Sequence, residues 1–234
     1  APLAPVVPHE MRFAGQSADE KRRALASELD RRCIDAAVLT SPDSIAWLLN
    51  IRGGDVPRTP LVLGFAILER TGQVRLFLDP RKLTPRARSH LGNGVAAMET
   101  TAFSTALDGL KGARVLVDPS SMPAFVAARL ESAGAELVRD VDPCQLPKAR
   151  KNPVELEGTR AAHRRDGVAL VRFLAWLDRA ASAGEVSELA AVEALAGYRR
   201  GGELFRDFSF DTISGAGPNG AIVHYRVPDQ SDRR

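Results

Sequence analysis

Few side chains in this sequence are of the kinds that perform chemistry, and its histidines are the most informative of them. They are His9, His90, His163 and His224. No two of them have the spacing by which one helix presents two histidines to the same metal ion. We therefore expect no metal site built by histidines of this chain. His9 and His90 are expected to be solvated, and His163 is expected on the surface of a helix.

His224 differs from the others because it follows a glycine-rich segment, GAGPNG at residues 215–220. This segment has the letters of the dinucleotide fingerprint, which requires a helix after its last glycine. Residues 221–225 predict a strand instead, and Pro218 removes one amide, so we expect a hairpin turn and no nucleotide site. An imidazole in a strand beside such a turn either contacts a ligand or is a satisfied structural histidine, and the residues alone leave both readings open.

Two cysteines and two aspartate pairs are the other reactive groups considered as candidates. They are Cys33 and Cys144, the pair Asp207 and Asp211, and the pair Asp140 and Asp142. Two cysteines are too few for a disulfide scaffold or a cysteine-rich zinc site, so we expect two buried thiols. The aspartate pairs stand mostly at the ends of predicted elements, where caps and turns explain them without acid–base catalysis.

One loop has an unusual composition. The segment NIRGGDVPRTP at residues 50–60 holds two adjacent glycines and two prolines between a predicted helix and a predicted strand. One reading is a rigid connection in which Arg52 and Asp55 pair with each other. The other reading is a loop presented to a neighbouring domain or to a substrate.

The composition excludes several classes of protein. Of the 234 residues, 44% are hydrophobic and 26% are charged, which is typical of a folded globular chain and not of a disordered or collagen-like one. The 32 Lys and Arg residues against 29 Asp and Glu give a net charge of only +3, which favours no nucleic-acid partner. No apolar run approaches the roughly 18 residues of a membrane span.

The elements that must position these side chains fall into two predicted units, the first at residues 10–145. A capping box at residues 17–20 begins a helix over 18–33. Two apolar runs separated by residues 70–72 predict an antiparallel hairpin. The full set of predicted strands is 36–40, 61–69, 73–79, 95–98, 113–118 and 135–139, and the other helices are 84–91, 102–110, 121–133 and one that begins at Pro42. This alternation predicts an α/β domain with a mixed sheet flanked by helices.

The second predicted unit covers residues 150–234. Asn152 as N-cap and Pro153 at the first helical position begin a long helix to about residue 182, and a second helix follows at 187–200. Strands are predicted at 208–214 and 221–225. Proline-rich linkers are expected at residues 1–9 and 141–153. Because the sequence starts in a linker without Met and ends in a polar loop, we expect further sequence on both sides.

Three segments taken together resemble the Xaa-Pro aminopeptidases (aminopeptidase P) of the long, three-domain type. They are SPDSIAWLLNIRGGDVP at 41–57, NPVELEGTRAAH at 152–163 and SFDTISGAGPNGAIVHY at 209–225. The resemblance implies a creatinase-like N-terminal α/β domain, followed by the first half of a pita-bread α+β catalytic domain. It also implies a cytoplasmic, homodimeric metallopeptidase that releases an N-terminal residue preceding proline. Its substrates would be peptides with proline at the second position, and its cofactors two divalent ions, with manganese as the expected metal.

The resemblance carries one site residue into this sequence. His224 matches the family histidine that lines the substrate pocket near the scissile bond, which favours the ligand-contacting reading. The two aspartates, one histidine and two glutamates that hold the family's metals lie beyond the His-Tyr motif. No residue carries over as a metal ligand or as a catalytic residue, and we expect the 234-residue chain alone to be inactive.

Three alternatives share the fold that the resemblance implies. A prolidase would cleave only dipeptides, and a creatinase-like hydrolase would work without metal. A non-catalytic binding or scaffold protein is the third, since none of the residues singled out above performs the reaction by itself.

Overall fold

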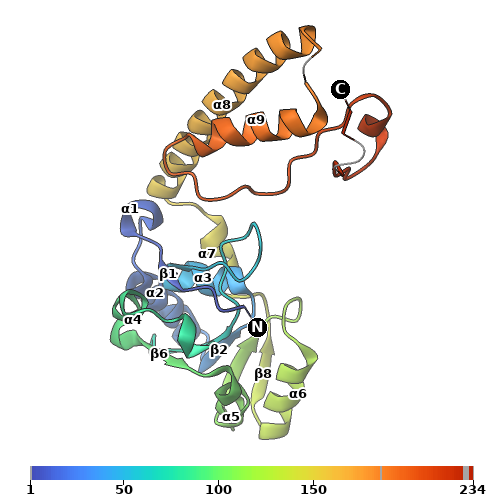
Figure 1. Cartoon of the computed structure of the whole chain (residues 1–234). Helices are drawn as coiled ribbons and strands as arrows, with labels where there is room; N and C mark the ends of the chain where they lie inside the picture. Colours follow the sequence, from blue (N-terminus) through green and yellow to red (C-terminus); the bar gives the residue numbers. More distant parts are fainter. Residues whose placement is uncertain (1, 185, 229–231, 234) are drawn as a thin grey trace. The chain divides into compact units, whose positions relative to one another are not determined.

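A six-stranded mixed sheet in the order β6-β5-β4-β2-β7-β8 forms the centre of the first part of the chain (Figure 1). The strands are β2 (Ala36–Leu39), β4 (Phe65–Glu69), β5 (Val74–Phe77), β6 (Val95–Met98), β7 (Arg114–Val117) and β8 (Glu136–Arg139). Strand β4 pairs antiparallel with β2 and β5, and the other neighbours in the sheet are parallel. This computed structural model describes residues 2–184, 186–228, 232 and 233.

Helices cover both faces of this sheet. They are α2 (Ala18–Arg31), α3 (Pro42–Leu49), α4 (Pro85–Leu91), α5 (Phe103–Asp108) and α6 (Ala124–Ala133). Ala37 and Leu39 of β2 pack in one apolar cluster with residues of α2, α3 and α4, whereas Ala36 and Val38 pack in a second cluster with residues of α5 and α6. Alternate side chains of a strand point to opposite faces, so a strand buried on both sides is apolar throughout. The predicted mixed sheet flanked by helices is confirmed.

Local signals begin and end these elements as predicted. The Ser17 hydroxyl accepts a hydrogen bond from the Glu20 N–H at 3.1 Å, and the Glu20 carboxylate accepts one from the Ser17 N–H at 2.8 Å. This capping box satisfies two backbone donors at the start of α2. Gly72, with a φ of +83°, closes the hairpin between β4 and β5, a conformation that glycine adopts without steric cost.

Several short elements were not predicted. Strand β1 (Val7–Pro8) pairs antiparallel with β3 (Ile51–Arg52), and the side chain of Val6 beside it is buried. The remaining elements of this part are α1 (Met11–Ala14), α7 (Gln145–Ala149) and the 3₁₀ helices η1 (Pro80–Lys82), η2 (Gly92–Gly94) and η3 (Thr100–Ala102). The proline-rich start of the chain therefore packs against the first unit.

The chain divides into two compact units, residues 1–155 and residues 156–234. At this boundary α8 (Pro153–Ser182) begins with the predicted N-cap. The Asn152 carboxamide oxygen accepts hydrogen bonds from the N–H groups of Val154 and Glu155, each at 3.0 Å, and the carboxamide nitrogen donates to the Ala14 carbonyl at 2.7 Å. One side chain thus starts α8 and ends α1.

The second unit contains the rest of α8, then α9 (Glu188–Arg200) and the 3₁₀ helix η4 (Gly217–Ala221). Both long helices match the prediction, but the predicted strands at 208–214 and 221–225, and the hairpin turn between them, were wrong. In the part of this unit that the structure describes, residues 201–228 form turns, coil and η4 and no strand. Two strands alone are marginally stable, and the described residues supply no third strand against which these two could pair.

No helix among the described residues has the length and apolar character needed to cross a membrane.

Candidate functional site

The segment that carries His224 wraps around a buried carboxylate, that of Glu188 at the start of α9. Glu188 is only 3% exposed. Its carboxylate accepts hydrogen bonds from the Ala216 N–H at 2.6 Å, from the Asn219 amide at 2.9 and 3.2 Å and from the Tyr225 hydroxyl at 2.9 Å. Asn219 and Tyr225 are each 8% exposed and hydrogen-bond to each other at 2.9 Å. The four side-chain and backbone groups form one closed network.

These contacts decide the charge of Glu188. Burial of the carboxyl group opposes its ionisation, but the hydrogen bonds donated by Ala216, Asn219 and Tyr225 outweigh burial, and the pKa of Glu188 lies below its usual value. As the first residue of α9, Glu188 also lies at the positive end of the helix dipole. The carboxylate is therefore ionised at neutral pH and acts as an acceptor only.

His224 lies on the surface beside this network. Its backbone has a φ of +54°, the left-handed region that few residues other than glycine adopt. The neighbouring Val223 is 82% exposed whereas Tyr225 is buried, and the imidazole of His224 is exposed. The structure thus places the predicted substrate-contacting residue in a sharp turn, and the prediction that His224 lies in a strand was wrong.

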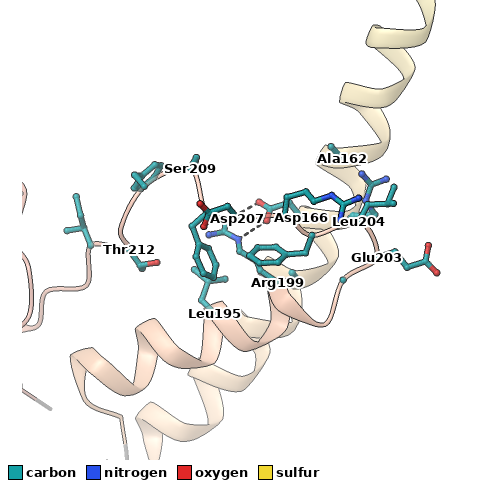
Figure 2. A pocket seen from close by; sticks show the side chains of 17 residues that line it. Ala162, Asp166, Leu195, Arg199, Glu203, Leu204, Asp207, Ser209 and Thr212 are labelled. Carbon is teal, nitrogen blue, oxygen red and sulfur yellow. Dashed lines mark hydrogen bonds and ion pairs between the residues drawn. The ribbon is translucent and has the colours of Figure 1, made fainter. Parts of the chain in front are cut away.

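A cavity of about 610 Å³ lies between α8, α9 and residues 202–213 (Figure 2). Figure 2 shows Asp166 of α8 joined to Arg199 of α9, with Nε–Oδ1 and Nη2–Oδ2 distances of 2.7 and 3.0 Å. The rings of Phe205 and Phe208, which also line it, meet edge to face with centroids 5.0 Å apart. No histidine or cysteine of the described chain lines this cavity, which offers apolar and ionic contacts together with the hydroxyl groups of Ser209 and Thr212.

His9 is not solvated, contrary to the prediction. Its ring is half-buried and stacks on Phe13, with centroids 5.9 Å apart. Burial, together with the positive charges of Arg52 and Lys21, lowers the pKa of His9 to about 4. His9 is therefore a neutral structural histidine at physiological pH.

The other two histidines are structural as well. His90 is half-buried, and its Nε2 atom lies 2.9 Å from the Leu49 carbonyl oxygen, so the prediction of a solvated side chain was wrong for it too. His163 is exposed on α8, as predicted, with Nδ1 at 2.9 Å from the Thr159 carbonyl oxygen. Neither histidine is close to His224 in the sequence, and neither shares a hydrogen-bond partner with it among the described residues.

The two thiols differ from each other. Cys144 is fully buried as predicted, and burial, together with the nearby charge of Asp142, raises the pKa of its thiol well above the usual value. Cys33 is exposed, so the prediction of a buried thiol was wrong for it. Cys33 follows the end of α2 in a left-handed turn, with a φ of +51°.

The aspartates act in local structure, as the sequence indicated. Asp140 accepts from Arg32 at 2.6 Å, and Asp142 accepts from the Cys144 N–H at 2.7 Å. Asp211 pairs with Arg226 at 3.4 Å. These contacts connect each of the three aspartates to a neighbouring loop or side chain.

In the loop at residues 50–60, the ion pair between Arg52 and Asp55 that one of the two readings expected does not form. Asp55 is bound to Lys82, with Nζ 2.6 Å from Oδ2, and it also accepts the Leu63 N–H at 2.7 Å. Arg52 instead donates to the backbone carbonyls of Ala46 and Ile51. Both Lys82 and Asp55 are buried, and their 27-residue separation gives no local sequence signal.

The described residues do not fit a metal centre. Within residues 2–184, 186–228, 232 and 233, no group of three or more His, Cys, Asp or Glu side chains is close enough to hold a metal ion. Zinc sites in proteins use at least three such ligands. The network around Glu188 supplies a single carboxylate surrounded by hydrogen-bond donors, which is an arrangement that binds no cation.

Comparison with known proteins connects both units to one group of enzymes. Residues 1–155 match the model of the creatinase/prolidase N-terminal domain, and residues 157–234 match the model of metallopeptidase family M24. Xaa-Pro aminopeptidase 1 of Dictyostelium discoideum is 36% identical over 231 residues, which cover 95% of this chain and 36% of that protein. The chain thus spans little more than a third of the length of this curated relative.

Solved structures agree with these matches. An X-prolyl aminopeptidase from Caenorhabditis elegans, described as a cytosolic enzyme with a di-nuclear active site, superimposes with a TM-score of 0.89 and 27% identity over 100% of this chain and 39% of that chain. The Xaa-Pro dipeptidase of Bacillus anthracis, with a TM-score of 0.58 and 16% identity over 79% of this chain and 49% of that chain, shares the fold alone. The resemblance to Xaa-Pro aminopeptidases and the predicted fold class are confirmed. The chain belongs to the creatinase/prolidase N-terminal domain family, and its residues 157–234 are similar to metallopeptidase family M24.

Proposed function

We propose that this chain is part of a metalloaminopeptidase that releases an N-terminal residue preceding proline. The observation that carries the proposal is the superposition of the whole chain on the Caenorhabditis elegans X-prolyl aminopeptidase, joined with the 36% identity to the Dictyostelium enzyme over 95% of the chain. Residues 10–145 would act as the middle domain of a three-domain enzyme, and residues 150–234 as the first half of its catalytic domain.

In this proposal His224 contacts the substrate. Proline has no N–H and a fixed φ, so an Xaa-Pro bond fits general peptidases poorly and needs a dedicated pocket. The exposed imidazole of His224, held in a left-handed turn, is available to donate a hydrogen bond to the substrate carbonyl. Such a donor stabilises the negative charge that develops on that oxygen in the transition state.

Two divalent ions, with manganese as the preferred metal, complete the proposed enzyme. The neighbouring structure is described as having a di-nuclear active site, and the family matched by residues 157–234 is a metallopeptidase family. Because the described residues form no metal-binding group, other residues would hold these ions. The 234 residues alone would then bind peptide without cleaving it.

The proposed partners follow from the same comparison. Substrates would be peptides with proline at the second position, and the enzyme would work as a homodimer in the cytoplasm. The description of the Caenorhabditis elegans enzyme as cytosolic supports this location. The net charge of +3 supports no nucleic-acid partner.

Activity on an Xaa-Pro-Xaa tripeptide is the test. A longer chain with a complete M24 domain should cleave the tripeptide, and a chelator should stop the reaction. In that protein His224→Ala should lower kcat/KM by roughly 10²- to 10³-fold with unchanged metal content, the usual cost of losing one transition-state donor. His163→Ala, which changes an exposed histidine on α8, is the control and should leave kcat/KM unchanged.

Other outcomes point to the alternatives. Cleavage of Xaa-Pro dipeptides but not tripeptides would identify a prolidase, and chelator-resistant hydrolysis would identify a creatinase-like enzyme. Peptide binding without hydrolysis in the longer chain would favour a scaffold. Full activity of His224→Ala would contradict the role given to this residue.

A further inference from the structure

The segment from Gly201 to Pro228 has little regular structure to hold it in place. Within it the structure describes one short 3₁₀ helix, η4, and otherwise turns and coil. After Phe208 apolar side chains do not fix the segment either, since Phe210, Ile213, Ile222 and Val223 are all exposed. Its conformation therefore depends on polar contacts.

Those contacts converge on Glu188. The carboxylate receives the Ala216 N–H from before η4, the Asn219 amide from within η4 and the Tyr225 hydroxyl from after it. Three separated points of one segment are thus tied to one side chain of α9. A buried carboxylate requires such donors, and the Ala216 N–H and the Tyr225 hydroxyl would lose this acceptor if the carboxylate were removed.

The last of these three ties adjoins His224. Consecutive Cα atoms are about 3.8 Å apart, so anchoring Tyr225 also fixes the backbone of His224. The left-handed backbone of His224 costs free energy and persists only where its surroundings hold it. With Tyr225 drawn inward to Glu188, the chain must turn at His224, and the imidazole remains exposed.

We propose that Glu188 is the positioning residue for His224: its buried carboxylate gathers Ala216, Asn219 and Tyr225, and so holds the imidazole where a peptide substrate can meet it. This inference rests on the proposed function, because that function assigns His224 its contact with the substrate. Glu188 itself touches no substrate. The mutual hydrogen bond between Asn219 and Tyr225 alone ties only two of the three points, so it does not replace Glu188.

The positional part is tested by hydrogen exchange in the 234-residue chain. Glu188→Ala should make backbone amides in residues 215–226 exchange at least about tenfold faster, because several hydrogen bonds to a charged group are lost. Amides in the middle of α8 should keep their rates. The matched control is Glu193→Ala, which changes the exposed glutamate of the same helix and should leave residues 215–226 unaffected.

Two further variants keep the test decisive if Glu188→Ala fails to fold. Tyr225→Phe removes one hydrogen bond to Glu188 and should raise the amide exchange rates around His224 more than those around Ala216. Glu188→Gln keeps an acceptor oxygen for the Ala216 N–H, so residues 215–226 should exchange more slowly in this variant than in Glu188→Ala. Unchanged exchange in residues 215–226 of a folded Glu188→Ala or Tyr225→Phe chain would overturn the inference.

The functional part is tested in the active longer chain by a double-mutant cycle. Glu188→Ala should lower kcat/KM about tenfold in the wild-type background and have no further effect beside His224→Ala, because both changes remove the same interaction. If Glu188→Ala left kcat/KM unchanged while His224→Ala lowered it, the positioning role of Glu188 would be overturned and the role of His224 would stand. Full activity of His224→Ala would overturn the proposed role of His224 and the positioning role with it.

Discussion

The Nζ atom of Lys82 lies 2.6 Å from the Oδ2 atom of Asp55, and both side chains are buried. The preceding residue, Arg81, lies at the same distance from Asp79, but the Arg81 side chain is 72% exposed. Two ion pairs of equal length therefore stand next to each other in the chain and differ mainly in their contact with water. Burial decides what each contributes to stability.

Removing Lys82, the cation of the buried pair, should lower the stability of the folded chain more than removing Arg81. Lys82→Ala should lower the free energy of unfolding by about 3–5 kcal/mol, because it leaves the Asp55 carboxylate buried and without a counter-charge. Arg81→Ala should leave it nearly unchanged, because water screens the exposed pair. Urea denaturation of the two variants measures the contrast. Equal losses in both would contradict this account of the loop at residues 50–60.

The stability of the first unit should fall in mild acid in part through His9. In the folded chain its pKa is about 4, below the ordinary value of 6.5, so the folded state binds the proton less readily than the unfolded state. Above about pH 6.5 both states are neutral and His9 contributes nothing to the pH dependence. As the pH falls from 6.5 to 4, the unfolded state gains the proton first and the free energy of unfolding decreases.

His9→Gln should weaken this decrease, because glutamine does not titrate. Denaturation midpoints at pH 7, 5.5 and 4.5 would show it as a flatter profile than that of the wild type. His163→Gln changes an exposed histidine and provides the control. An identical profile for His9→Gln and the wild type would show that His9 is accessible to protons in the folded chain.

The core should be most sensitive at Phe77. Its side chain is fully buried, and its ring lies with its centroid 5.1 Å from that of Phe103. Phe77→Ala should lower the free energy of unfolding by about 3–5 kcal/mol through lost burial and the cavity left behind. Phe125→Ala, at a position 53% exposed, should cost much less in the same urea titration. Similar costs would mean that the core collapses around the smaller side chain.

The glycine-rich segment at residues 215–220 should bind no dinucleotide. Its last four residues belong to η4, a 3₁₀ helix of 5 residues that offers no α-helical N-terminus for a pyrophosphate. Titration with NAD, FAD or ATP should therefore leave the melting temperature unchanged. A saturable upward shift with micromolar affinity would contradict this prediction.

Most of the first unit could be predicted because its signals are local. The capping box before α2, the proline that begins α3 and the glycine between β4 and β5 each act within four residues. Strands β1 and β3 were missed because two-residue strands carry no periodicity. The predicted strands at 208–214 and 221–225 failed for a different reason: an alternating pattern shows that a strand can form, whereas a partner in space decides whether it does.

The candidate site was only partly accessible from the sequence. His224 was identified by resemblance, and its exposure in a left-handed turn required the structure. Glu188 was missed although it stands in a predicted helix, because its partner Asn219 lies 31 residues away. A glutamate in the first turn of a helix is usually a favourable charge near the dipole, and nothing in its immediate neighbours distinguishes a buried one.

The double role of Asn152 has a consequence for chemical ageing. Its carboxamide starts α8 through its oxygen and ends α1 through its nitrogen, so conversion to aspartate would set a carboxylate oxygen against the Ala14 carbonyl. Asparagine deamidates when the next backbone nitrogen attacks its side chain, and the next residue here is Pro153, which has no N–H. The same proline that begins the helix therefore protects the Asn152 cap from this route of deamidation.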